Sequence, residues 1–385
     1  MSVIRPCKIF KKVVVGMSGG VDSTVSALIL KEKGYHVIGA YMQNWDFNDE
    51  IGNCTSNHDS LDVEKTCSHL GIEFIRLNFI KAYWNEVFSN VINEYELGIT
   101  PNPDILCNRH IKFDLFFKHC LDKLKVDAIA TGHYAITTFG PFLEHYNPEI
   151  GVRLLKAKDS LKDQSFFLSN VNQIALQKTM FPLGNYTKAE VKNIAKENGF
   201  LNIARRKESM GMCFIGSRNF SKFISQYIPN KSGLCIQIDS GNEVGRHSGV
   251  HQWAMGQRFK MGGQRTRQFI CGIDSSTQNL YIATGKSHPS LWGQFLRTYK
   301  PHWIHSIPAE LTSNKILFCD FRFRHNQPLA PCKLLRLPSD NLVINVMVPI
   351  QSIAKGQFAV FYRGNECLGS AKITAAGPSL YSLTH

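Results

Sequence analysis

Short apolar runs alternate with amphipathic segments through the first half of the chain. Residues 13–17, 35–42, 72–79 and 126–131 are rich in β-branched side chains and bounded by turn residues, which is typical of buried strands. The segments between these runs carry apolar residues at helical spacing, and most end at a glycine. This alternation predicts an α/β fold with a doubly wound, Rossmann-like parallel sheet, whose ligand crevice lies at the carboxyl ends of the strands.

The predicted helices cover residues 24–34, 60–70, 81–97, 109–124 and 187–198. The last of these is the best defined, because Thr187 and Glu190 form a capping box and Gly199 ends the pattern. Residues 153–157 are expected to extend the sheet or to form a hairpin.

The pattern changes after residue 216. A helix over 219–227 is followed by short strands broken by glycines, and beyond residue 286 the segments 316–323, 332–337, 342–348 and 358–362 predict a small β-barrel. A chain of 385 residues is also too long for one compact core. We therefore expect three domains, an N-terminal α/β domain over 1–216, a small basic central domain over 217–286 and a C-terminal β-barrel over 287–385.

The loop Ser18-Gly19-Gly20-Val21-Asp22-Ser23 joins the first predicted strand to the first helix. Two glycines allow a sharp turn and close approach of a ligand, and the serine hydroxyls and helix-start amides offer several donors to one anion. The loop is neither a Walker A motif nor a Rossmann glycine motif. It resembles the SGGxDS loop of the N-type ATP pyrophosphatases, which split ATP between the α and β phosphates and activate a carbonyl oxygen as its adenylate. The resemblance implies that residues 1–216 form an adenylating, catalytic domain. A simple Gly/Ser helix cap is the alternative, but the strand before the loop and Asp22 within it favour a nucleotide.

The charge is strongly basic, with 44 Lys and Arg against 30 Asp and Glu and a net charge of +14. The excess is concentrated in residues 201–235, with six basic residues against one acid, and 241–300, with eight against two. One such cluster is usually a solvated face, whereas two adjoining clusters favour a polyanion-binding surface. No apolar run is long enough to span a bilayer, so we expect a soluble protein without membrane contact.

The 11 cysteines are odd in number and scattered, without a CxxC pair, so we expect mostly free thiols in a reducing compartment. Cys107 follows a segment in which Pro101 and Pro103 predict a stiff loop before the helix at 109. Asp104 in that segment is by itself more often a helix cap. Cys213 lies in a glycine-containing segment, where a buried structural thiol is the ordinary interpretation. Two such cysteines in an adenylating protein together suggest a thiol relay.

These motifs together resemble one family over nearly the whole chain and in the same order. They are SGGVDS, Pro-Asn-Pro-Asp-Ile-Leu-Cys-Asn over 101–108, Thr-Gly-His-Tyr over 131–134, Lys-Asp-Gln-Ser over 162–165, Gly-Met-Cys-Phe-Ile-Gly over 211–216 and Gly-Gln-Phe-Ala-Val-Phe-Tyr over 356–362. The chain is similar to the tRNA-specific 2-thiouridylases. The stretches 207–213 and 321–325 resemble the animal mitochondrial branch most.

The resemblance implies an enzyme that uses ATP, together with Mg²⁺, to replace the C2 oxygen of the tRNA wobble uridine with sulfur. It implies Cys107 as the nucleophile, Cys213 as the persulfide cysteine and Asp104 as a general base or a group that orients the uracil. Sulfur would leave Cys213 as a persulfide or as hydrosulfide, and a Cys107–Cys213 disulfide would remain. The implied ATP contacts are Gly16, Met17, Ser18, Gly19, Gly20, Val21, Asp22, Ser23, Met42 and Gly132. The implied tRNA contacts are Asn102, Pro103, Asp104, Lys162, Asp163, Gln164, Arg322 and Phe323.

The expected partners are the anticodon stem-loop of tRNA and an upstream sulfur carrier or cysteine desulfurase, and we expect a monomer in the mitochondrial matrix. The N-terminus is basic and free of acids before Asp22, like a short mitochondrial targeting segment. The chain departs from bacterial members at Phe323, which replaces a tyrosine, and in the shortened glycine segment 261–263. Two rival functions are a different SGGxDS enzyme acting on a small molecule, which would not need both cysteines, and a catalytically silent tRNA-binding protein.

Overall fold

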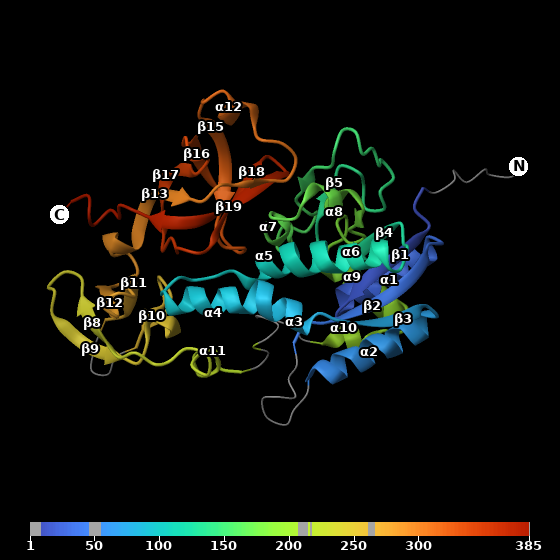
Figure 1. Ribbon diagram of the computed structural model, residues 1–385, viewed down its shortest axis with the longest axis horizontal. Coiled ribbons are helices and arrows are strands. Elements are labelled where there is room, and N and C mark those ends of the chain that lie inside the picture. The colour runs from blue at the N-terminus through green and yellow to red at the C-terminus, as the bar shows by residue number, and fades with distance from the viewer. Residues whose placement is uncertain (1–8, 46–54, 207–214, 216–217, 261–265, 385) are drawn as a thin grey trace, which may run out of the picture. The chain divides into compact units, whose positions relative to one another are not determined.

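The computed structural model describes residues 9–45, 55–206, 215, 218–260 and 266–384. Contacts divide the chain into two compact units. The first unit contains residues 1–84, 105–210 and 365–367, and the second contains 85–104, 211–364 and 368–385. Figure 1 shows the elements of both, coloured from blue at the N-terminus to red at the C-terminus. The predicted division into three domains stays a prediction.

The first unit is built on a five-stranded sheet with the strand order β3-β2-β1-β4-β7, in which all pairs are parallel. Its strands are β1 (Lys12–Met17), β2 (His36–Gln43), β3 (Glu73–Asn78), β4 (Ala128–Thr131) and β7 (Thr179–Met180). The first four were predicted from their apolar runs, and the predicted doubly wound sheet is confirmed. The strand β7 was missed because two residues are too few to produce a periodic pattern.

Helices and short hairpin strands surround this sheet. They are α1 (Val21–Glu32), α2 (Thr55–Leu70), α3 (Ile80–Tyr83), α5 (Pro103–Cys107), η2 (Asn108–Phe116), α6 (Phe117–Asp122), β5 (Ile136–Thr137), β6 (Leu154–Leu155), α7 (Ser165–Leu168), α8 (Gln173–Gln177), α9 (Lys188–Glu197) and α10 (Leu201–Arg205). β6 pairs antiparallel with β5, which is the hairpin alternative of the two expected for residues 153–157, and it also pairs with Glu366 and Cys367. α9 begins at the predicted capping box, in which Thr187 and Glu190 bond to each other's backbone amides.

One prediction about the start of a helix was wrong. The stretch 100–108 was expected to be a loop as far as residue 108, whereas helix α5 begins at Pro103 and continues through η2 and α6 to Asp122. Proline suits the first helical position because its missing N–H has no partner there in any case. Asp104 therefore lies in the first turn of the helix, and Cys107 lies within a helix and not in a loop.

The second unit contains a small sheet and a barrel. The sheet has the order β10-β11-β12-β8-β9 and packs around Cys235, Ile270 and Ile282. The strands of this sheet are β8 (Gly233–Gln237), β9 (Glu243–His247), β10 (Arg258–Phe259), β11 (Gln268–Asp274) and β12 (Asn279–Thr284). The same unit contains α4 (Ser89–Glu96), α11 (Phe220–Ile224), η3 (Val250–Gln252) and all but the first residue of η1 (Trp84–Phe88). The predicted helix at 219–227 is confirmed by α11, which is shorter.

The predicted C-terminal barrel is confirmed. Its strands follow the order β13-β17-β16-β15-β18-β19, and β13 pairs with β19 to close the circle. They are β13 (Trp292–Thr298), β15 (Leu317–Arg322), β16 (Ala330–Arg336), β17 (Leu342–Gln351), β18 (Phe358–Arg363) and β19 (Glu366–Ala376), with η4 (Pro289–Leu291), β14 (His302–Trp303) and α12 (Ala309–Thr312) beside them. In the part of the chain that the structure describes, no helix is long and apolar enough to cross a membrane.

Candidate active site

The loop between β1 and α1 lies where the order of the parallel sheet reverses. β1 has β2 on one side and β4 on the other, so the carboxyl ends of β1 and β4 flank the switch point at which ligands bind in doubly wound folds. Gly19 has a φ of +77°, which favours glycine. Gly20 caps α1 without a side-chain hydrogen bond, so the first amides of this 12-residue helix are not capped by a side chain. This is a cradle for an anion.

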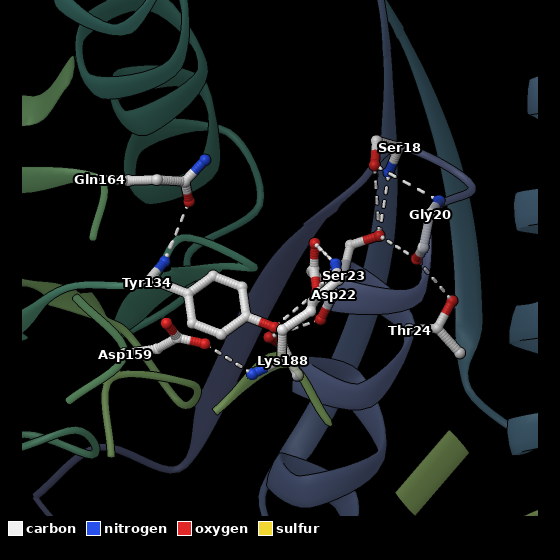
Figure 2. A network of polar contacts seen from close by, with 10 residues as sticks. Ser18, Gly20, Asp22, Ser23, Thr24, Tyr134, Asp159, Gln164 and Lys188 are labelled. Carbon is white, nitrogen blue, oxygen red and sulfur yellow. Dashed lines mark hydrogen bonds and ion pairs between the residues drawn. The ribbon is translucent and has the colours of Figure 1, made fainter. Parts of the chain in front are cut away.

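The two serines of the loop hold its shape. The Ser18 backbone amide donates to the Ser23 hydroxyl at 3.2 Å, and the Ser23 hydroxyl donates to the Gly20 carbonyl at 3.1 Å. The Ser18 and Ser23 hydroxyl oxygens are 3.4 Å apart, so both hydroxyls lie on one side of the loop (Figure 2). Their mutual contacts are long enough to be exchanged for contacts to a bound phosphate.

Asp22 is the centre of a polar cluster that the sequence did not predict. Lys188 Nζ lies 2.7 Å from each carboxylate oxygen of Asp22, and the Tyr134 hydroxyl donates to Asp22 Oδ1 at 2.9 Å (Figure 2). The Lys188 ammonium is also 5.7 Å from the centroid of the Tyr134 ring. The Lys188 side chain is 12% exposed and that of Asp22 is 33% exposed, so the cation is fixed beside the loop and reachable from solvent. Lys188 supplies the positive charge that the motif itself lacks.

Gly132 lets β4 approach the start of α1. A Cβ atom at this position would lie 2.7 Å from the Ser23 amide nitrogen and 2.8 Å from the Asp22 carbonyl carbon, so only glycine fits. The next residue, His133, has its Nδ1 2.8 Å from the Thr131 hydroxyl. Burial, with a smaller contribution from the charge of Lys112, lowers the pKa of His133 well below its usual value. This imidazole is therefore neutral near pH 7.

Asp163 and Gln164 hold the following loop against Tyr134. The Gln164 side-chain oxygen Oε1 accepts from the Tyr134 backbone amide at 3.0 Å, and the Gln164 backbone amide donates to the Tyr134 carbonyl at 2.8 Å. The buried Asp163 carboxylate accepts from the amides of Ala157 and Ser165. These contacts position Tyr134, while the predicted contact of Lys162, Asp163 and Gln164 with tRNA stays a prediction.

Two further predicted ATP contacts surround the end of β1. A Cβ atom on Gly16 would lie 3.2 Å from Met42 Cε, so the Met42 side chain packs against the backbone of β1 just before the loop. On another side, the Arg206 guanidinium is 2.5 Å from Asp62 Oδ2 and 3.5 Å from the Gly19 carbonyl oxygen. Arg206 brings a second cation to the loop, and no motif pointed to it.

In the second unit, the motif over residues 356–362 holds the segment that carries Asn102. The Gln357 amide donates to the carbonyls of Thr100 and Pro101 at 3.0 and 2.9 Å, and its Oε1 accepts from Asn102 Nδ2 at 3.2 Å. Gly356 has a φ of +92°, and a Cβ atom there would lie 2.8 Å from the Thr100 carbonyl oxygen. The structure thus brings together two motifs that are more than 250 residues apart in the sequence.

No disulfide joins any two of the cysteines that the structure describes, namely Cys67, Cys107, Cys120, Cys235, Cys271, Cys319, Cys332 and Cys367. Burial raises the pKa of Cys120 to about 12, and burial with a nearby glutamate raises the pKa of Cys67 and Cys235 to about 11. Such thiols stay protonated and unreactive at neutral pH. Cys107 is buried in its helix with 6% exposure. Cys213, the second predicted catalytic cysteine, lies outside the described residues.

Arg322 and Phe323 are both buried in the C-terminal barrel region. The Phe323 ring has 0% exposure and belongs to the barrel core. The Arg322 guanidinium donates to the His325 carbonyl at 3.0 Å and to the Tyr362 hydroxyl at 3.1 Å. Contact of the Phe323 ring with RNA would require the ring to leave the core, and the tRNA role of both residues stays a prediction.

Three family descriptions match the chain in succession. They are the tRNA methyl transferase HUP domain over residues 11–217, the tRNA methyl transferase PRC-barrel domain over 221–284 and the aminomethyltransferase beta-barrel domain over 294–373. The chain is 46% identical to mitochondrial tRNA-specific 2-thiouridylase 1 of Drosophila melanogaster, over 96% of this chain and 95% of the relative. It is 45% identical to the protein of that name from Homo sapiens, over 97% and 92%. A probable mitochondrial tRNA-specific 2-thiouridylase 1 from Caenorhabditis elegans is 41% identical, over 94% and 98%.

Proposed function

This chain belongs to the tRNA-specific 2-thiouridylase family, and from that premise we propose that it replaces the C2 oxygen of the tRNA wobble uridine with sulfur while splitting ATP. It is a tRNA thiouridine sulfurtransferase, and it is mitochondrial like its relatives. The matrix is the compartment that we propose within the organelle. The observation that supports the ATP-dependent step best is the cradle after β1, with Lys188 fixed beside it.

ATP fits the residues that are present. The side chain that Gly132 lacks would fill the space against Ser23, and the amides at the start of α1 have no side-chain cap, so the loop is shaped for an anionic group. Lys188 and Arg206 add positive charge on two sides. We therefore place the phosphates of ATP at Gly16 to Ser23, with Met42 and Gly132 beside the nucleotide.

Asp22 acts in this proposal through Lys188 and not as a metal ligand. Its carboxylate is occupied by the ammonium and by the Tyr134 hydroxyl. Within the described ranges no group of three or more His, Cys, Asp or Glu side chains could hold a metal ion. Mg²⁺ would then enter with ATP and be held chiefly by phosphate oxygens.

ATP supplies the adenylyl group that converts the C2 oxygen of uridine into a leaving group. In this step the residues of the loop hold the departing pyrophosphate, and Lys188 offsets the charge that develops on it. Asp104, in the first turn of α5, is proposed as the general base or as the group that orients the uracil edge. The neutral His133 neither adds charge to the site nor removes it.

Sulfur transfer is proposed to use Cys213 and Cys107. The terminal sulfur of a Cys213 persulfide forms a bond to C2 and displaces AMP, and the Cys107 thiolate then attacks Cys213 Sγ. The bond between Cys213 Sγ and the transferred sulfur breaks, its electron pair goes to the thiocarbonyl, and a Cys107–Cys213 disulfide remains. If Cys107 attacks first, hydrosulfide is released and adds to C2 instead. In both routes, two thiols are oxidised as the persulfide sulfur is reduced, and a thiol reductant resets the enzyme.

The experiment that tests this function is mass spectrometry of nucleosides from an unmodified tRNA transcript incubated with the protein, ATP, Mg²⁺ and a sulfide or persulfide donor. Wild-type protein is expected to form 2-thiouridine. Cys213→Ser should form none with the persulfide donor, whereas the control Cys271→Ser should match wild type because Cys271 has no role in the proposed chemistry. Activity of Cys213→Ser equal to wild type with the persulfide donor would remove that cysteine from the mechanism.

A further inference from the structure

The outer face of the barrel carries a row of side chains across four neighbouring strands. Phe295 on β13 lies opposite Asn345 on β17, Asn345 lies opposite Lys333 on β16, and Lys333 lies opposite Phe318 on β15. Directly opposite residues on antiparallel strands have Cβ atoms about 5 Å apart, so these four side chains form one continuous line roughly 14 Å long.

The alternation of the strands shows that this row faces outward. Its sequence neighbours Leu296, Ile344, Leu334 and Leu317 form the matching inner row and are at most 2% exposed. The rings of the outer row are exposed, by 38% for Phe295 and by 63% for Phe318. Large aromatic side chains at that exposure on a folded strand indicate a surface that binds a ligand or a partner molecule.

A second outer row runs beside the first one. Arg297 on β13 lies opposite Val343 on β17, and Val343 lies opposite Leu335 on β16. The structure describes every residue of both rows, and none of them is acidic. Asp320, two residues after Phe318 on β15, is the nearest acid along that strand. The Lys333 ammonium lies 5.5 Å from the centroid of the Phe318 ring, so the positive charge is directly beside an exposed ring.

We propose that this face, formed by Phe295, Asn345, Lys333, Phe318 and Arg297, binds unpaired nucleotides of the tRNA substrate. Two exposed rings stack on two bases, Lys333 and Arg297 contact phosphates, and the Asn345 amide faces base edges. Sheets that present aromatic rings with basic and amide side chains between them are a common way to bind single-stranded RNA, because every base has a face to stack. The proposal rests on the proposed function for the identity of the RNA.

RNA is favoured over a protein partner by two features of the face. The apolar residues are divided by a lysine and an asparagine, whereas the centre of a protein interface is depleted of charge. The charged residues of both rows are also basic, as is the chain as a whole with its net charge of +14. Arg322 and Phe323, the barrel residues predicted to contact tRNA, are buried, so this face gives the barrel a different and exposed contact.

The test compares the affinity of an unmodified tRNA transcript for wild type, Phe318→Ala, Phe295→Ala and the double variant at one stated salt concentration. We expect each single change to weaken binding by about 5- to 100-fold, the range for loss of one base stack, and the double change to weaken it further. Lys333→Met should make the plot of log affinity against log salt concentration less steep, by about the slope that one phosphate contact contributes. The control is Ile174→Ala, which removes an apolar side chain that is 71% exposed on α8 and should bind tRNA as wild type does.

Crosslinking provides a measurement that does not depend on the folding of variants. Wild-type protein irradiated with tRNA containing 5-iodouridine should yield crosslinked peptides that contain Phe318 or Phe295. Affinities of the double variant within twofold of wild type, with no such peptides, would overturn the proposal. If the double variant binds tRNA normally but loses 2-thiouridine formation only when a protein carries the sulfur, the face binds that protein and the RNA proposal is wrong. A wild type that binds tRNA through these rings yet forms no 2-thiouridine would contradict the proposed function alone.

Discussion

The loop at Ser18–Ser23 and the pair Arg322 and Phe323 were both singled out in the sequence, but their surroundings are opposite. In the loop, the Asp22 side chain is 33% exposed and bonds to Lys188 and Tyr134 at the open end of a parallel sheet. In the barrel, Phe323 has 0% exposure and Arg322 has 8%. A motif at the end of a parallel strand marks side chains that face a ligand, whereas a motif within a closed barrel also includes the residues that fill its core.

Removal of the cation beside the loop should have the largest effect. Lys188→Met takes away the charge that faces the phosphates and leaves Asp22 without its ion-pair partner. We expect the rate of pyrophosphate release from ATP to fall by about 100- to 1000-fold, as for the loss of one preorganised electrostatic contact.

The matched control for this prediction is Lys158→Met. Lys158 pairs with Glu190 near the start of the same helix, but both side chains are about half exposed, and such a pair contributes little. A rate within twofold of wild type is expected for this control. Equal losses for the two variants would show that the effect is general and not specific to the loop.

Phe323→Ala and Phe318→Ala test the contrast within the barrel, since the two rings are five residues apart. The first should lower the free energy of unfolding by about 3–5 kcal/mol, because it leaves a cavity in the core. The second removes a ring that is 63% exposed and should change that free energy by less than about 0.5 kcal/mol while it weakens tRNA binding. Chemical denaturation and tRNA titration of both variants check this. Weaker tRNA binding by a stably folded Phe323→Leu would instead support the predicted contact of Phe323 with tRNA.

Replacement of His133 should have the smallest effect, which is a change in how the free energy of unfolding depends on pH. Its pKa in the folded protein is lowered by burial, so the unfolded chain takes up a proton below pH 6.5 that the folded chain resists. The stability contributed by the neutral ring is present above pH 6.5 and should be lost as pH falls, by at most about 1.4 kcal/mol per pH unit. Unfolding of wild type and His133→Gln between pH 7 and 5 measures the difference in slope. Parallel curves would remove His133 as the cause.

Most of the fold was predictable because long periodic runs define its elements. The strands β1 to β4 and the helix α9 followed from apolar patterns and a capping box. The start of α5 was misjudged because proline was treated as a breaker, although it is favourable at the first helical position. The strands β13 and β19, which close the barrel, were not predicted. For β19 the reason is that it is rich in small residues, which carry a weak strand pattern.

The candidate site was predictable only where its residues are local in sequence. Lys188 pairs with Asp22 across 166 positions, and Gln357 holds Asn102 across 255. No spacing rule connects such distant residues, because the fold alone brings them together. Gln357 lies in the motif over residues 356–362, but no role was predicted for it.

The central claim is that ATP is split between its α and β phosphates to activate the uridine. The most direct test is to quantify AMP, pyrophosphate, ADP and inorganic phosphate together with 2-thiouridine in one reaction with tRNA and a persulfide donor. We predict one AMP and one pyrophosphate for each 2-thiouridine formed. Formation of 2-thiouridine with ADP and inorganic phosphate in place of AMP and pyrophosphate would contradict the claim.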